Sequence, residues 1–528
     1  MKLKWGILAI ATLLLDNLPC ARMPTDTLGA EFIRVAADQW AFEGVSSGKR
    51  FIPFGSNLVW NCPSGKDNAQ GLDILVRAQW DPTAVRRAFD AARSLHMNIL
   101  KVFLPCHRVL CDPQANDQVT FPEMVPPLPE RLDFLFQTAR ETNVYVSLAF
   151  AEWGAHSLRW WQDGGTFVGR GNEVHPDIDS YAVLRNFWKA LTVRYKDEPL
   201  LFSYNLAVEF YMPNGNWGAQ KGGDPKYDRV LADRWGLPAW HAYVKEALGA
   251  VENVNARWKT SYAAIEEVPQ PECVWIGTEN RYSMPQAMLA DYGSFKEYLT
   301  YTFLRNQVEA IRSVDQRHMI TCGYHPHHPA IGWMGSAEYV AGAAPSELDL
   351  LDYTTVHVYT NRAEYAPGVD PQQFAAAVVG ARFAWAGKPV IAEEMGHITT
   401  DRSETTRETI NLVKILMPHV SGHMLWFLSD LGPTTTYGPL NSDLTVNSFG
   451  EAWRQLAVPG GLLTSPPNGR ELPARTIQLE RISGMAPIAL TDAQRLLPQW
   501  ESSPEPVDFV LEKNPMIQRL RQNAVPSR

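Results

Sequence analysis

The sequence predicts an α/β protein built on a (β/α)8 TIM barrel, because helical segments alternate with short apolar runs along most of its 528 residues. Runs that are apolar throughout are typical of strands buried on both faces, as in a parallel sheet. Eight such strands closed on themselves make a barrel. The rival fold, an open doubly wound sheet, usually carries a glycine-rich phosphate turn after its first strand, and the sequence has none.

The strand candidates are short runs in which almost every residue is apolar. They are 51–58, 98–104, 144–150, 200–209, 319–322, 351–357, 388–396 and 423–427. Segments with apolar residues at helical spacing lie before most of these runs. We expect helices over 82–95, 130–142, 181–195, 295–314, 372–385 and 404–417.

The barrel is interrupted by a long insertion after strand four. Its first part, 214–227, is rich in Gly and Asn and predicts a surface loop, while 238–248 predicts a helix. Pro- and Gly-rich stretches after residue 458 mark the end of the barrel. We therefore expect the barrel over 30–457 and a short C-terminal extension, without an assigned role, over 458–528.

The N-terminus is typical of an export signal. Lys2 and Lys4 precede an apolar run, 5–15, that is too short to span a bilayer comfortably. We expect a signal peptide over 1–21 and a secreted or periplasmic protein. A lipid anchor at Cys20 is the minor alternative, because Pro19 fits a lipoprotein signal badly.

Composition narrows the class of partner. The net charge of −9 argues against nucleic acid or an anionic membrane surface. The 18 tryptophans are many for this length, and tryptophan stacks well on the apolar faces of sugar rings. An oligo- or polysaccharide is the expected partner, and no cofactor is implied.

The cysteines and histidines do not predict a metal site. Five of the six cysteines follow the signal segment, at a spacing unlike that of a zinc site: Cys62, Cys106, Cys111, Cys273 and Cys322. A bridge from Cys62 to Cys106 or Cys111 and a set of small buried thiols are equally compatible with the sequence. The histidines at 325, 327 and 328 have no acidic neighbour and favour a polar pocket over a metal.

Two glutamates end strand-like runs, Glu209 after 200–208 and Glu394 within 388–396. A carboxylate at the C-terminal end of a buried strand is poorly solvated and rigidly held. In a parallel barrel this end carries the active site. Two such carboxylates facing each other across a pocket can act as an acid and a nucleophile.

Around these glutamates, residues 51–427 resemble clan A glycoside hydrolases, particularly the cellulase-like family 5. In that clan the general acid/base ends strand four and the nucleophile ends strand seven, where an aromatic residue and Gly commonly follow. The resemblance assigns these roles to Glu209 and Glu394, the latter in Glu-Met-Gly. The segment 251–262 is similar to an insertion in family 42 β-galactosidase-like enzymes.

Further positions match the clan pattern and imply substrate contacts. His357 and Tyr359 look like its His-x-Tyr at the end of strand six, and Trp426 looks like the tryptophan that floors the sugar site. Asn57 looks like the Asn of a Gly-x-Asn motif that ends strand one. Trp60, beyond strand one, is a candidate sugar platform.

Other positions depart from the pattern. Val208 and Phe210 stand where the clan usually has Asn and Pro on either side of the acid. Lys101 stands where strand two commonly has an arginine that orients the nucleophile, and the two cations differ in geometry. Asn205, within strand four, is the residue that can partly compensate for the missing Asn.

Glu393 is the rival for the nucleophile. Adjacent residues of a regular strand point to opposite faces, so we expect only one of Glu393 and Glu394 to face the pocket. The family pattern selects Glu394. The reaction expected from the resemblance is hydrolysis of a β-glycosidic bond with retention of configuration. A carbohydrate-binding barrel that has lost catalysis and a transglycosylase with the same glutamate pair are the alternatives.

Overall fold

We describe the fold from a computed structural model of the chain. The residues that it describes are 30–39, 41–59, 75, 80–105, 128–151, 178–208, 237–269, 273–276, 279–282, 285–323, 349–359, 388–417, 420–430, 437–457, 516–517 and 519. The predicted signal segment, most of the C-terminal extension and the predicted helix over 372–385 lie outside these residues.

Eight parallel strands form the central sheet, in the order β10-β7-β6-β5-β4-β13-β12-β11. They are β4 (Phe54–Asn57), β5 (Ile99–Pro105), β6 (Tyr145–Ala151), β7 (Leu201–Asn205), β10 (Met319–Thr321), β11 (Thr354–Tyr359), β12 (Val390–Gly396) and β13 (Gly422–Leu425). The two edge strands, β10 and β11, meet through a parallel bridge between Gly323 and Thr355. The sheet therefore closes, and the predicted (β/α)8 barrel is confirmed.

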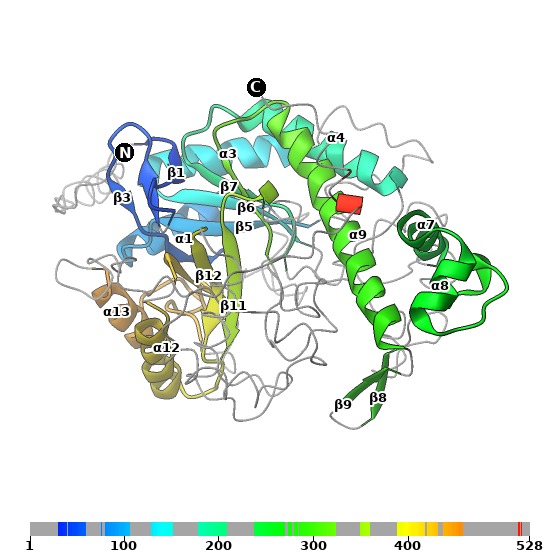
Figure 1. Ribbon diagram of the computed structural model, residues 1–528. Helices are drawn as coiled ribbons and strands as arrows, with labels where there is room; N and C mark the ends of the chain where they lie inside the picture. The colour runs from blue at the N-terminus through cyan, green and yellow to red at the C-terminus, as the bar shows by residue number, and fades with distance from the viewer. Residues whose placement is uncertain are drawn as a thin grey trace, which may run out of the picture.

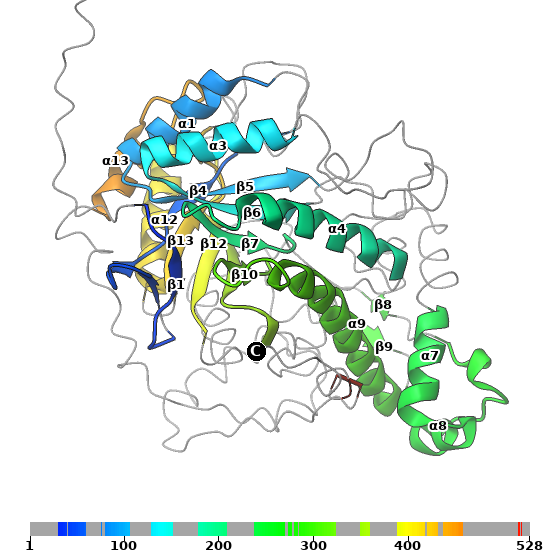
Figure 2. The same cartoon turned by 90° about the horizontal axis from the view of Figure 1, so that it is seen from above.

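Helices surround this sheet (Figure 1). They are α1 (Pro82–Ser94), α3 (Leu128–Thr142), α4 (Ile178–Tyr195), α9 (Gln286–Arg312), α12 (Arg402–Leu416) and α13 (Ser448–Gln455). The carboxylate of Asp81 caps α1 by accepting from the backbone N–H of Thr83 at 2.9 Å, and Asp401 caps α12 in the same way. Helix α9 starts nine residues before the predicted position (295 − 286 = 9) and lies beside α4 (Figure 2).

A small antiparallel sheet covers the N-terminal end of the barrel, and the sequence did not predict it. Its strands are β1 (Ile33–Val35), β2 (Phe42–Gly44) and β3 (Arg50–Phe51). The predicted first strand is divided at Pro53, because proline has no N–H for the sheet ladder. Phe51 joins the small sheet and Phe54 begins the barrel. The ring of Phe42 lies 5.3 Å from that of Phe202 and 5.4 Å from that of Tyr353.

The insertion after strand four forms a helical unit with its own core. It contains α7 (Leu237–Leu248), α8 (Val251–Trp258), the 3-10 helix η3 (Ile265–Glu267) and the hairpin of β8 (Cys273–Ile276) and β9 (Glu279–Tyr282). Figures 1 and 2 show α7 and α8 beside the N-terminal end of α9, away from the sheet. Trp240, Trp258 and Phe295 pack in this core together with Met516 of the C-terminal extension. No helix in the described part of the chain is long and apolar enough to cross a bilayer.

Candidate active site

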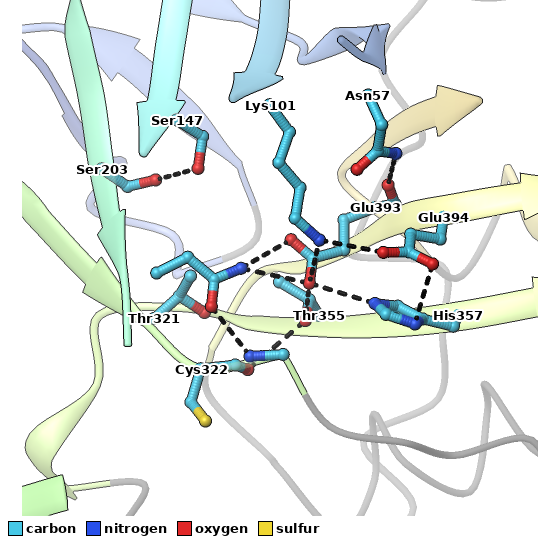
Figure 3. A network of polar contacts seen from close by, with 12 residues as sticks. Asn57, Lys101, Ser147, Ser203, Thr321, Cys322, Thr355, His357, Glu393 and Glu394 are labelled. Carbon is cyan, nitrogen blue, oxygen red and sulfur yellow. Dashed lines mark hydrogen bonds and ion pairs between the residues drawn. The ribbon is translucent and has the colours of Figure 1, made fainter. Parts of the chain in front are cut away.

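The strand that carries the two glutamates, β12, contains a β-bulge. Ala392 pairs with Val356 of β11 and Glu394 pairs with the next residue, His357, so Glu393 is an extra residue in the ladder. The pairing with β13 shifts over the same residues. An extra residue interrupts the alternation of faces. Glu393 and Glu394 both reach the cluster of side chains around Lys101, and the expectation that only one of them would face inward is wrong (Figure 3).

Asn57, at the end of β4, holds this bulge. Its Nδ2 donates to the carbonyl oxygens of Glu393 and Leu425, each at 2.8 Å. The side chain is fully buried, and these bonds satisfy carbonyl groups next to the interrupted ladder. The sequence predicted Asn57 as a substrate contact. In the structure its amide group binds the backbone of β12, which carries the glutamates, and of the neighbouring β13.

Glu393 is the deeper of the two carboxylates and is almost completely buried, with 2% of its surface exposed. Its Oε1 accepts from Thr355 Oγ1 at 2.8 Å and lies 3.2 Å from both Lys101 Nζ and His357 Nε2. Its Oε2 accepts from Asn205 Nδ2 at 2.9 Å. Donors from β5, β7 and β11 therefore surround this carboxylate.

A glycine directly after β10, two strands away from β12, makes room for Glu393. A Cβ at Gly323 would lie only 2.7 Å from Glu393 Oε1 and 2.9 Å from the carbonyl oxygen of Ala207. The backbone N–H of Gly323 also donates to Asn205 Oδ1 at 3.0 Å, which fixes the amide that binds Glu393. Sequence reasoning considered Glu393 only as a rival nucleophile and missed Gly323, since a bulge leaves no clear pattern in a single sequence.

Glu394 lies nearer the C-terminal end of the strands. Its Oε1 is 3.2 Å from Lys101 Nζ, and its Oε2 accepts from the hydroxyl of Tyr359 at 3.0 Å. His357 Nδ1 is 3.3 Å from the same Oε2. The strand-six and strand-two residues that the sequence singled out therefore converge on the predicted nucleophile.

The charged groups of this cluster shift one another's pKa values. Burial would raise the pKa of Glu393, but the charge of Lys101 and the hydrogen bond from His357 outweigh it and lower this pKa to about 2. Burial would likewise lower the pKa of Lys101, yet the charges of Glu393 and Glu394 raise it. Glu393 is therefore ionised and Lys101 protonated at neutral pH.

Apolar side chains form a separate cluster around the C-terminal ends of the strands. It includes Phe103, Val208, Tyr359 and Trp426. Trp426 follows β13 directly, and its ring lies 5.9 Å from that of Phe103 in a T-shaped arrangement. The predicted sugar-floor tryptophan is therefore placed beside Tyr359, the residue that binds Glu394.

Two predicted site residues, Glu209 and Trp60, lie outside the described residues. Strand β7 ends at Asn205 rather than at Glu209. The chain nevertheless continues along β10, because the backbone N–H of Leu206 donates to Thr321 O and that of Gly323 donates to Ala207 O, both at 2.8 Å. The possible bridge partners Cys62, Cys106 and Cys111 and the histidines at 325, 327 and 328 also lie outside the described residues. Within the described part, no group of three or more metal-ligating side chains is placed to hold a metal ion.

The sequence matches a known family over residues 173–401, a segment that contains both Glu209 and Glu394. The matching model is that of β-galactosidases, glycoside hydrolase family 42. The match covers less than half of the chain, so it shows a similarity to this family over that segment. The segment 251–262, which resembles a family 42 insertion, lies within this match, so the predicted resemblance is confirmed. No curated protein matches the sequence.

Solved structures of a β-galactosidase and a β-mannosidase share this fold at low sequence identity. A β-galactosidase from Bacillus circulans sp. alkalophilus is 15% identical with a TM-score of 0.53, over 77% of this chain and 55% of that chain. An exo-β-1,4-mannosidase from Opitutaceae bacterium strain TAV5 is 16% identical with a TM-score of 0.50, over 80% of this chain and 61% of that chain.

A family 5 enzyme from Streptomyces cattleya, in complex with Manβ1-4GlcNAc, is similar over more of its own length. It is 14% identical with a TM-score of 0.50, over 79% of this chain and 83% of that chain. The present chain thus spans less than two thirds of the β-galactosidase and the mannosidase but most of the family 5 enzyme. At these identities the similarity establishes the fold.

Proposed function

We propose that this protein hydrolyses β-glycosidic bonds in oligo- or polysaccharides with retention of configuration. The observation that carries the proposal is the surrounding of Glu394, a buried carboxylate at the C-terminal end of a barrel strand that faces Lys101, His357 and Tyr359. A nucleophilic carboxylate must be ionised and held in one orientation, and these groups favour both.

Glu394 would attack the anomeric carbon of the bound sugar and form a covalent glycosyl-enzyme, which water then hydrolyses. The hydroxyl of Tyr359 and the ammonium of Lys101 each bind one oxygen of the carboxylate. They limit rotation of the carboxylate, so that less entropy is lost on reaching the reactive geometry.

The second carboxylate of the proposed mechanism is Glu209. As a general acid it must be protonated near neutral pH, a state that desolvation and a nearby carboxylate favour. Glu209 would protonate the leaving oxygen and later activate the attacking water.

The similar proteins suggest which sugars to test first. The family model is that of β-galactosidases, and the similar structures include an exo-β-1,4-mannosidase and a complex with Manβ1-4GlcNAc. We propose a β-galactoside or a β-mannoside as the substrate. Aryl β-glycosides of both sugars, followed by mannan and galactan oligosaccharides, distinguish the two.

Covalent labelling tests the nucleophile directly. An activated 2-deoxy-2-fluoro β-glycoside should leave an ester on Glu394, identified by mass spectrometry of the digested protein. Glu394→Ala should lower turnover by about 10⁴-fold or more, because the nucleophile is missing. A label on Glu393, or full turnover by Glu394→Ala, contradicts the assignment. Glycan binding without turnover in the wild type favours a binding protein, and lengthened products favour a transglycosylase.

We also propose that the protein is exported, as its N-terminal segment predicts. Mass spectrometry of the mature protein from its native cell envelope should find the chain beginning near residue 22. A lipid-modified N-terminus at Cys20 would instead support the anchored alternative.

A further inference from the structure

Glu393 lies beside the proposed nucleophile but is not available for chemistry itself. Its Oε1 is within 3.2 Å of Lys101 Nζ, His357 Nε2 and Thr355 Oγ1, and its Oε2 binds Asn205. All of these partners are protein groups. A carboxylate with this many donors is a poor nucleophile and holds no proton to give, so its burial calls for another explanation.

Two of its partners also contact Glu394. Lys101 Nζ is 3.2 Å from an oxygen of each glutamate, and His357 places Nε2 toward Glu393 and Nδ1 toward Glu394. Both ring nitrogens can donate only when the ring is an imidazolium. In that state, with Lys101 charged, the cluster would contain two cations and two anions and be neutral.

We propose that Glu393 is a positioning residue, which holds Lys101 and His357 against the nucleophile and offsets their charge. The bulge in β12 serves this role, because it places two consecutive carboxylates on one face of the strand where a regular strand would place one. The proposal rests on the proposed function of Glu394. It predicts that Glu393 tunes the ionisation of Glu394 without touching the substrate.

The titratable groups that face this pair come from three strands. They are Lys101 from β5, His357 and Tyr359 from β11, Tyr353 directly before β11, and the two glutamates themselves from β12. From β7, the neutral Asn205 completes the surroundings. Removing the charge of Glu393 leaves Lys101 and His357 facing Glu394 alone. The ionised form of Glu394 then becomes more favourable, and its pKa should fall.

The experiment compares Glu393→Gln with the wild type in the pH dependence of kcat/KM on the active aryl glycoside. The acidic limb reports ionisation of the free enzyme's nucleophile. We expect this limb to move to lower pH by about one unit, as loss of a neighbouring like charge predicts. We expect kcat at the optimum to fall about a hundredfold, because Lys101 and His357 are no longer held.

Glu393→Asp is the conservative variant. It keeps the charge but shortens the side chain, so the carboxylate oxygens lie farther from Lys101 and His357. The acidic limb of the pH profile should therefore return to the wild-type position, while kcat stays low. It also keeps the proposal testable if Glu393→Gln does not fold. A wild-type kcat in Glu393→Asp overturns the proposal.

Asp315→Asn is the matched control, since Asp315 is a buried carboxylate beside His318 at the opposite end of the barrel. This variant should lose stability and leave the acidic limb in place. The positioning role is overturned if the acidic limb of Glu393→Gln stays at the wild-type pH, or if Asp315→Asn shifts this limb by the same amount. Labelling of Glu394 in the wild type is read separately, so a failure of the proposed function is distinguished from a failure of this inference.

Discussion

The two ends of the barrel each bury a carboxylate beside a histidine, but the pairs differ in their surroundings. At the N-terminal end, His318 Nδ1 lies 2.5 Å from Asp315 Oδ2, and its Nε2 lies 2.8 Å from the carbonyl oxygen of Glu198. The hydroxyl of Tyr204 donates to the same carboxylate oxygen at 3.0 Å. One histidine thus serves one carboxylate. At the C-terminal end, His357 and Lys101 are shared between two.

This difference separates a stabilising pair from a proposed reactive one. In both places burial opposes ionisation, and the neighbouring cation or hydrogen bond overcomes it, so that the pKa values of Asp315 and Glu393 both fall to about 2. At the C-terminal end the second carboxylate, Glu394, contacts the same Lys101 and His357 as the first. The end of a barrel where the strands finish is also the end where function resides. Sharing one set of cations between two carboxylates makes each sensitive to the other, which suits a nucleophile better than a structural contact.

Removal of the shared cation should have the largest effect. Lys101→Met leaves Glu393 and Glu394 buried near each other without their ammonium partner. We expect the free energy of unfolding to fall by about 3–5 kcal/mol, as for other buried pairs that lose one member. Turnover should be lost with it. Urea denaturation and the aryl glycoside assay measure the two effects.

Lys101→Arg is the control, because it keeps the charge and changes the shape of the donor. It should recover much of the stability lost in Lys101→Met but not the full activity. Wild-type stability in Lys101→Met would show that Lys101 stabilises the C-terminal cluster no more than a solvent-exposed ion pair would.

The sequence predicted the barrel well because its signal is repeated. The alternation of helices with apolar runs recurs along the chain, and the glutamate, histidine and tyrosine of strands six and seven stand at their expected ends. Glu393 shows why the rest was harder. Its orientation depends on a bulge that Asn57 stabilises from across the sheet, and such a contact joins residues 336 positions apart. Local patterns carry no information about it.

The small N-terminal sheet was missed for a related reason. Its strands are only two or three residues long, and an alternating pattern needs more residues than that to be distinct. Phe42 is buried through contact with Phe202 and Tyr353, residues far away in the chain. Tertiary packing, rather than local propensity, places this sheet at the N-terminal end of the barrel.

The acid dependence of stability should compare the two carboxylates directly. A lowered pKa stabilises the fold above the group's ordinary pKa, and this stabilisation is lost as the pH falls toward the folded value. For Glu393 the loss begins near 4.5 and for Asp315 near 3.8, and both extend to about 2. Glu393→Gln and Asp315→Asn should therefore each flatten the fall in stability below these values.

Chemical denaturation at pH intervals between 5 and 3 measures this fall. The two variants should differ at the upper edge of the window, where Glu393→Gln already departs from the wild-type slope and Asp315→Asn does not. If the free energy of unfolding depended on pH in the same way in both variants, the two carboxylates would stabilise the fold over the same pH range and the expected difference would be absent.

The smallest expected effect comes from single hydroxyl groups within the barrel. Thr355 Oγ1 donates to the charged Glu393 at 2.8 Å, whereas Thr321 Oγ1 donates to the neutral carbonyl oxygen of Tyr353 at 2.7 Å. Hydrogen bonds to charged groups contribute about 1.5–3 kcal/mol and neutral ones about 0.5–1.5 kcal/mol. Thr355→Val should therefore destabilise the protein more than Thr321→Val, in urea denaturation at pH 7. At pH 2, where about half of the Glu393 carboxyl is protonated, part of this excess should disappear, because in the protonated half the hydrogen bond joins two neutral groups. An excess that persists undiminished at low pH would mean that the charge of Glu393 is not what distinguishes the C-terminal end of the barrel.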